Sequence, residues 1–209
     1  MKNIITIIIT FIVISCNTVE TKKEEVVESL TKEEKLKELY LKTVKPLFKE
    51  FTEVDIPNEF RIDKNDVSVN AGAATNYVEV SQGLIEYDKN YIQVFVLTHE
   101  LGHLVTLKQA EQFHLGTEIP NGAKTNAYKK AEYLADIIAM YLLTTQEVAL
   151  GNELIANIEV LQSLLGPEIF THPSAADRVA LINEYVEKSA KENAKTAFQE
   201  MFRRIWKME

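Results

Sequence analysis

Two histidines and a glutamate are closely spaced in the segment His99-Glu-Leu-Gly-His103. The segment follows an apolar run, residues 91–97, which favours a buried helix. Side chains four positions apart lie on one face of a helix, so both imidazoles can reach one tetrahedral zinc ion. Glu100 then lies beside the ion, where its carboxylate can accept a proton from a bound water. This H-E-x-x-H pattern predicts a metal-assisted hydrolytic site.

A second acidic pair, Glu132 and Asp136, occurs in the segment Ala131-Glu-Tyr-Leu-Ala-Asp136. Apolar residues follow at helical spacing, which predicts that the two carboxylates share one side of a helix. Glu132 is expected to supply the third protein ligand to zinc and to leave the fourth position open for water. Asp136 is expected to accept the free ring N–H of a ligating histidine, His99. The alternative is that both carboxylates belong to a solvated polar face.

These two segments resemble the gluzincin metallopeptidases, and other stretches resemble the HtpX/Oma-like branch, which is related to the CAAX prenyl proteases. Asn70-Ala71 followed by residues 77–85 is similar to the strand and turn that precede the zinc helix in that family. Thr171-His-Pro-Ser174 with Arg178 and Leu181 resembles its downstream His-Pro…Arg…Leu signature. The resemblance covers about residues 65 to 185.

The resemblance implies a zinc endopeptidase with His99, His103 and Glu132 as metal ligands and Glu100 as the general base. It also implies that Asn70 and Ala71 belong to an edge strand that holds the substrate backbone as an added strand. A flexible turn is the alternative for this small-residue segment, because glycine and asparagine favour turns.

The downstream signature leaves two roles open for each of its polar residues. His172 is interpreted either as a stabiliser of the oxyanion of the tetrahedral intermediate or as part of the start of a helix at Pro173-Ser174. Arg178 is either a second cation for the same oxyanion or the partner of a structural carboxylate. His114 has no comparable context and is expected at the surface.

The first residues indicate an exported protein. Lys2 precedes an apolar stretch, residues 4–14, that is too short to span a bilayer and is typical of a signal peptide. The stretch ends in Val13-Ile-Ser-Cys16, which resembles the lipobox of bacterial lipoproteins, so Cys16 is the expected site of lipidation. We therefore expect a signal peptide at 1–15, a polar tether at 16–30 and a metallopeptidase domain at 31–209, anchored by lipid in the bacterial cell envelope. A plain secretory signal or an uncleaved anchor is the alternative.

The expected fold is α+β, a mostly helical zincin-like domain with a small β-sheet or hairpin before the H-E-x-x-H helix. A helix is expected from the capping-box pattern at Thr31, with apolar positions through Phe51 and a kink at Pro46. Strands are expected between residues 60 and 70. Five further helices are expected at residues 91–109, 125–143, 145–165, 173–188 and 191–206.

Composition limits the partners. The chain carries 31 acidic and 23 basic residues and a net charge of −8, which argues against a nucleic-acid surface. The expected partners are polypeptide substrates and, through Cys16, a membrane. Two other functions fit the same motif: a non-catalytic zinc-binding envelope lipoprotein that acts as a chaperone or assembly scaffold, and a regulatory peptidase of the ImmA-like type. The intact Glu100 argues against the scaffold, which would not need a base, and the lipobox and the His-Pro…Arg signature argue against the ImmA-like type, whose members are cytoplasmic.

Overall fold

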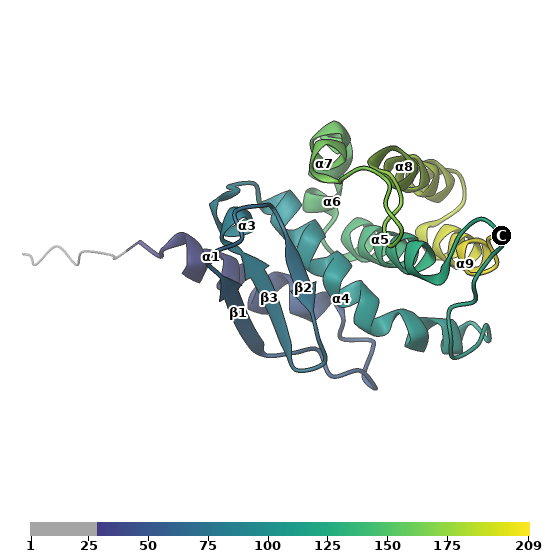
Figure 1. Ribbon diagram of the computed structural model, residues 1–209, viewed down its shortest axis with the longest axis horizontal. Helices are drawn as coiled ribbons and strands as arrows, with labels where there is room; N and C mark the ends of the chain where they lie inside the picture. Colours follow the sequence, from purple (N-terminus) through teal and green to yellow (C-terminus); the bar gives the residue numbers. More distant parts are fainter. Residues whose placement is uncertain (1–28) are drawn as a thin grey trace, which may run out of the picture.

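The computed structural model describes residues 29–209, and one long helix, α4 (Asn90–Gln112), separates a small sheet from a group of C-terminal helices (Figure 1). The mostly helical composition with a small sheet confirms the α+β expectation. The predicted signal peptide and Cys16 lie outside the described residues, as does the tether up to residue 28. Within residues 29–209, no helix is both long enough and apolar enough to cross a membrane.

The first described helix begins where its capping box predicted. Thr31 Oγ1 accepts a hydrogen bond from the backbone N–H of Glu34, and the Glu34 carboxylate accepts one from the backbone N–H of Thr31. Pro46 has no amide hydrogen, so a regular helical hydrogen bond is missing there, and a π-helical turn lies directly before it. The helix ends at Leu47 and does not reach Phe51, contrary to the prediction. Its three consecutive parts are α1 (Lys32–Leu39), η1 (Tyr40–Val44) and α2 (Lys45–Leu47).

Three short strands form one sheet in the order β1-β3-β2. The expected strand between residues 60 and 70 is β1 (Glu59–Asp63), and it pairs in parallel with β3 (Tyr77–Ser81). β2 (Ala71–Ala73) pairs antiparallel with β3 and lies at the edge of the sheet. The alternative of a turn at this small-residue segment is therefore wrong for Ala71–Ala73. A short helix, α3 (Gln82–Glu86), follows β3 and leads to α4.

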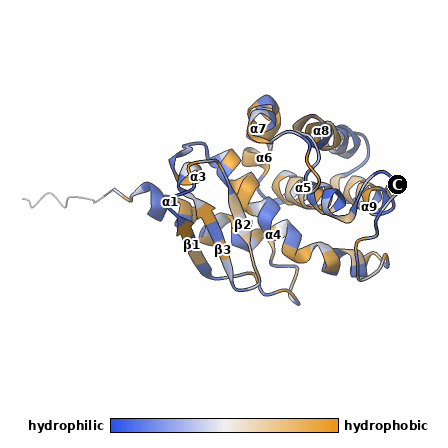
Figure 2. Cartoon of the chain, in the orientation of Figure 1, coloured by the Kyte–Doolittle hydropathy of each residue, from blue (hydrophilic) through white to orange (hydrophobic). Residues whose placement is uncertain are grey.

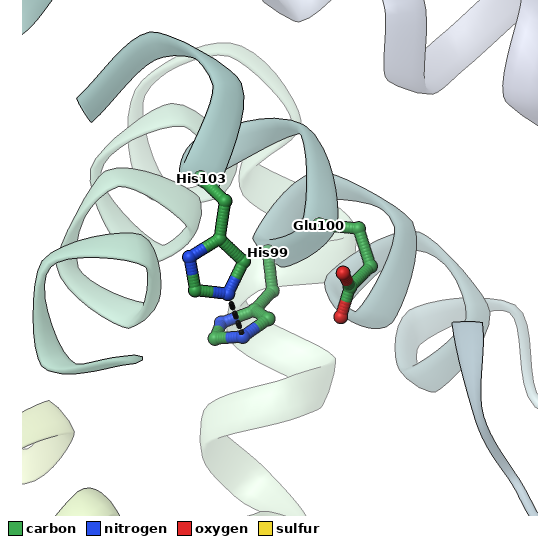
Figure 3. Close-up of side chains that lie close together, drawn as sticks. All are labelled: His99, Glu100 and His103. Atoms are coloured by element: carbon green, nitrogen blue, oxygen red, sulfur yellow. Dashed lines mark hydrogen bonds between the residues drawn. The ribbon is translucent and has the colours of Figure 1, made fainter. Parts of the chain in front are cut away.

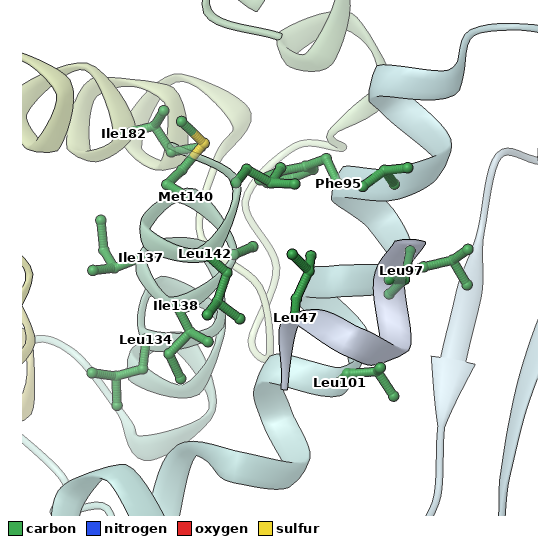
Figure 4. Close-up of a cluster of buried hydrophobic side chains, with 14 of the residues drawn as sticks. Leu47, Phe95, Leu97, Leu101, Leu134, Ile137, Ile138, Met140, Leu142 and Ile182 are labelled. Carbon is green, nitrogen blue, oxygen red and sulfur yellow. The ribbon is translucent and has the colours of Figure 1, made fainter. Parts of the chain in front are cut away.

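The two helices that carry the predicted site pack directly against each other. α5 (Ala127–Gln146) lies beside α4, and Gly102 makes the close approach possible. A Cβ atom at Gly102 would lie 3.2 Å from the carbonyl oxygen and 3.3 Å from the Cα of Ala135. Figure 4 shows the core around these helices, where apolar side chains of α4 and α5 meet Leu47 of α2. The core thereby sets the distance between the histidine helix and the carboxylate helix.

The C-terminal helices correct one prediction. The helix expected at residues 145–165 is broken at Asn157 into α6 (Val148–Ala156) and α7 (Ile158–Leu164). The Asn157 side chain donates a hydrogen bond to the carbonyl of Glu153, an interaction that satisfies a backbone group at the end of α6. Ser174 and Asn193 cap the next two helices, α8 (Ala175–Lys191) and α9 (Ala194–Trp206).

The apolar stripe of α9 is buried as predicted for core packing. Figure 2 shows apolar and polar bands alternating along the C-terminal helices. The buried members of the stripe are Phe198, Met201, Phe202, Ile205 and Trp206. Their burial leaves the charged face of α9 toward solvent.

Candidate metal centre

The two histidines of α4 face each other across one helical turn. The Nε2 atoms of His99 and His103 lie 3.1 Å apart, and their rings are nearly perpendicular (Figure 3). His99 is buried, whereas His103 is partly accessible. Two imidazole nitrogens so close together form one side of a possible coordination sphere, as the four-residue spacing predicted.

Glu132 approaches this pair from α5. Its Oε2 atom lies 3.4 Å from His99 Nε2, and its Oε1 atom lies 3.4 Å from His103 Nε2. Burial by itself would raise the pKa of Glu132, but the facing imidazoles hold it far below its usual value. The carboxylate is therefore ionised and directed at both nitrogens, so the alternative of a solvated polar face is wrong for Glu132.

Glu100 is the second carboxylate beside the imidazoles. Ligand atoms of His99, Glu100 and His103 all lie within 4.8 Å of one another, so this group can hold a metal ion. In the described part of the chain, no hydrogen bond or ion pair to another side chain engages the Glu100 carboxylate, in contrast to Glu132. Burial raises the pKa of Glu100 above its usual value. Of these two carboxylates, burial favours the protonated form of Glu100, whereas the imidazoles favour the ionised form of Glu132.

A buried ion pair supports the ligands from behind. Asp136 Oδ1 lies 2.9 Å from His99 Nδ1, the hydrogen bond that the sequence predicted. Burial would lower the pKa of His99, but the charge of Asp136 and the hydrogen bonds to Asp136 and Glu132 together raise that pKa to about 9. Burial would raise the pKa of Asp136, yet Arg178 keeps it below its usual value. Asp136 therefore stays charged and orients the ring of His99.

All three nitrogen atoms of the Arg178 guanidinium face carboxylates. Nε and Nη2 bond to Asp136, and Nη1 lies 3.2 Å from Glu132 Oε2. Burial opposes the charged form, but these carboxylates raise the pKa of Arg178 above its usual value. Of the two roles left open by the sequence, this geometry favours the partner of structural carboxylates.

His172 reaches the site from the loop between α7 and α8. Its side chain is 50% exposed, and its Nε2 atom lies 3.6 Å from Glu132 Oε1. Its other ring nitrogen lies 2.8 Å from the hydroxyl of Thr171. The helix start at this point is made by Ser174, whose Oγ accepts from the backbone of Asp177. His172 is thus free of the cap and faces the cleft, whereas His114 is exposed away from it, as expected.

The site lies in an open cleft of about 300 Å³. One wall is the segment that leads into β2, where Asn70 and Ala71 line the cleft. The backbone N–H and carbonyl of Asn70 both bond to Ser81, so this wall is fixed to the start of α3. The opposite wall is apolar and had not been predicted, because its residues carry no motif in the sequence. It is formed by Leu161, Leu164 and Leu165.

The residues present fit a small tetrahedral ion. Bonds of about 2.0–2.1 Å in a tetrahedral arrangement separate ligand atoms by about 3.3–3.4 Å. The nitrogen–nitrogen distance of 3.1 Å and the two nitrogen–oxygen distances of 3.4 Å agree with this spacing. Two nitrogens and one carboxylate oxygen form a donor set that suits zinc.

Comparison with models of protein families, with curated proteins and with solved structures finds no match for this chain. What the site can do therefore follows from its own geometry.

Proposed function

We propose that this protein is a zinc-dependent endopeptidase of the bacterial cell envelope, a lipoprotein member of the HtpX/Oma-like metallopeptidases with a zincin-like domain. The observation that carries the proposal is the approach of Glu132 to the His99–His103 pair, with Glu100 unpaired beside it in an open cleft. A group used only to bind metal has no need of an unpaired carboxylate with a raised pKa at its side.

The proposed chemistry is peptide hydrolysis with Glu100 as general base. His99, His103 and Glu132 would hold the zinc ion, which would supply Lewis-acid activation of water and of the scissile carbonyl. Glu100 accepts the proton of the attacking water and passes it to the leaving amine. A pKa raised above its usual value makes the Glu100 carboxylate a better acceptor for the proton of the attacking water.

His172 is the proposed donor to the oxyanion that develops on the scissile carbonyl. It lines the cleft on the side of Glu132 and is exposed enough to approach a bound peptide. An N–H group directed at this oxygen contributes mainly in the transition state. Arg178 has its nitrogens engaged by Asp136 and Glu132, so we assign it the role of positioning the ligands.

The substrate backbone is proposed to lie along the edge of β2. Strand addition requires a free sheet edge beside the reacting groups, and Asn70 and Ala71 border both β2 and the cleft. Recognition through the main chain depends little on substrate sequence. Such a site suits cleavage of unfolded exported or membrane proteins, that is, quality control in the envelope.

A trapping experiment tests this function. Wild-type protein is expected to cleave unfolded polypeptides, and Glu100→Gln is expected to lower turnover by roughly 10²–10⁴-fold while it retains zinc. The matched control is Glu187→Gln, which changes an exposed glutamate of α8 and should leave turnover unchanged. Mass spectrometry of proteins that co-purify with the Glu100→Gln protein should identify substrates held in the cleft. Normal turnover by that variant would refute the assignment of the base, and zinc binding without any turnover by the wild type would favour the chaperone or scaffold. Radiolabelled palmitate at Cys16 tests the anchor.

A further inference from the structure

A second hollow of about 390 Å³ lies beyond His103, between the C-terminal half of α4 and the start of α5. The peptide hydrolysis proposed for the metal centre does not use this hollow. Its walls come from both zinc helices and from the loop that joins them. The residues that line it include Thr106, Leu107, Ile119, Tyr128 and Ala131.

This hollow adjoins the cleft that contains the candidate metal centre. His103 lines both the hollow and the cleft that contains Glu100 and Glu132. A second link runs through Tyr128, whose ring centroid lies 5.9 Å from that of Phe170. Phe170 is two residues from His172, which lines the cleft. The hollow therefore lies next to the cleft on the His103 side.

The loop that carries Phe170 is held against the start of α5. Asn126, which caps α5, also donates a hydrogen bond of 2.8 Å to the carbonyl of Phe170. Lys129 of α5 forms an ion pair with Glu168 of the same loop. These two contacts keep Phe170 beside Tyr128 at the edge of the hollow.

The chemistry of the hollow is apolar. Glu118 supplies the one charged carboxylate of its lining. Eight large apolar side chains are exposed in the described residues; two of them line this hollow, and a third, Phe170, packs against Tyr128 beside it. These three are Leu107 at 45% exposure, Tyr128 at 60% and Phe170 at 72%. Clustered exposed apolar side chains beside a cleft mark a binding surface.

The geometry points to a specificity subsite that receives one large apolar side chain of the substrate, aromatic or leucine-like, next to the bond that is cut. This inference rests on the proposed peptidase function and names its substrate class: unfolded chains that expose large apolar residues. The single carboxylate at the rim disfavours acidic side chains, because their charge would lie near Glu118. Folded proteins bury such apolar residues, so the subsite would select against them.

Binding can be measured separately from cleavage. The probes are fluorescent peptides of serine and alanine with one central phenylalanine, leucine, glycine or glutamate, and the protein is full-length Glu100→Gln. Fluorescence anisotropy should show that the phenylalanine and leucine peptides bind roughly 10- to 100-fold more tightly than the glycine peptide. Introducing Leu107→Lys into the Glu100→Gln protein should remove most of this preference and strengthen binding of the glutamate peptide. The matched control is Leu41→Lys, an equally exposed leucine of η1 that lines neither the cleft nor the hollow.

The outcomes separate the subsite from the peptidase. Equal binding of all four peptides, or an apolar preference that survives Leu107→Lys, would overturn the subsite. Cleavage by the wild type with no apolar preference at any position would also overturn it, while the peptidase would stand. An apolar preference that depends on Leu107, combined with no cleavage by the wild type, would leave the subsite standing and remove the peptidase.

Discussion

Arg178 holds Asp136 through two parallel hydrogen bonds, from Nε to Oδ2 at 2.8 Å and from Nη2 to Oδ1 at 2.6 Å. Both side chains are buried. The same Oδ1 atom lies 2.9 Å from His99 Nδ1. Arg178 therefore fixes the position of the Asp136 carboxylate, and that carboxylate in turn orients the His99 imidazole. The orientation of His99 therefore depends on a contact between α5 and α8 that lies behind the candidate metal centre.

The first prediction concerns the stability of this ion pair. Arg178→Leu leaves Asp136 buried without its cation and should lower the free energy of unfolding by about 3–5 kcal/mol. Arg204→Leu is the control, because its pair with Glu184 lies at the surface and should cost no more than about 1 kcal/mol. Urea denaturation followed by circular dichroism measures both. Equal losses in the two variants would contradict the role given to Arg178.

The second prediction concerns the metal. His103→Ala removes one imidazole nitrogen and should purify without zinc by elemental analysis, because two remaining ligands hold the ion weakly. Since a ligand that binds only the folded state stabilises it, a chelator should lower the unfolding temperature of the wild type but not of His103→Ala. His114→Ala changes an exposed histidine outside the cleft and should retain zinc. Full zinc content in the His103→Ala protein would exclude His103 as a ligand.

The third prediction concerns the contact between the two ligand helices. Gly102→Ala places a Cβ atom 3.2–3.3 Å from the backbone of Ala135, so the helices must move apart. We expect a loss of about 1–3 kcal/mol in stability and weaker zinc binding in competition with a chelator, because Glu132 moves away from the imidazoles. Gly72→Ala is the control, since no atom lies within 4 Å of the added Cβ atom. Unchanged zinc affinity in Gly102→Ala would show that the helix distance does not control the site.

The fourth prediction concerns alkaline pH. Burial raises the pKa of Tyr40 to about 12, compared with about 10 in an unfolded chain. A folded-state pKa above the unfolded value means that the stabilisation is complete below pH 10 and is lost as the pH rises toward 12. Ionisation of Tyr40 should then cost about 2 kcal/mol of stability at pH 12. Tyr40→Phe should show a smaller fall in stability between pH 10 and 12 than the wild type, measured by urea denaturation at each pH.

The control for this titration is Tyr128→Phe, which changes an exposed tyrosine. Its fall in stability over the same pH range should match that of the wild type. Identical curves for Tyr40→Phe and Tyr128→Phe would show that Tyr40 does not contribute to the alkaline loss.

Local periodicity was enough to predict the parts of the site that lie on single helices. His99 and His103 face one point because helical geometry stacks residues four apart. The same rule predicted that Glu132 and Asp136 lie on one side of α5. The prediction that Asp136 would meet His99 is confirmed, and it rested on the rule that a buried imidazole needs an acceptor for its ring N–H.

Predictions were less successful where the backbone departs from regular structure. The break at Asn157 was missed because asparagine is tolerated in a helix and ends one only where its side chain finds a backbone partner. The parallel pairing of β1 with β3 was missed because pairing depends on contacts between distant segments. The apolar wall at Leu161 and the hollow at Leu107 were missed for the same reason.

The sequence by itself determined which side chains share a helical face, and hence the pairing of two imidazoles with a neighbouring carboxylate. Only the tertiary structure decided that Glu132 meets those imidazoles, that Arg178 turns its nitrogens toward carboxylates, and that apolar walls flank the centre. The physical reason is the different length of chain over which each effect acts. Helical periodicity acts over a few residues, whereas the distance between α4 and α5 is set by the packing of a core drawn from the whole domain.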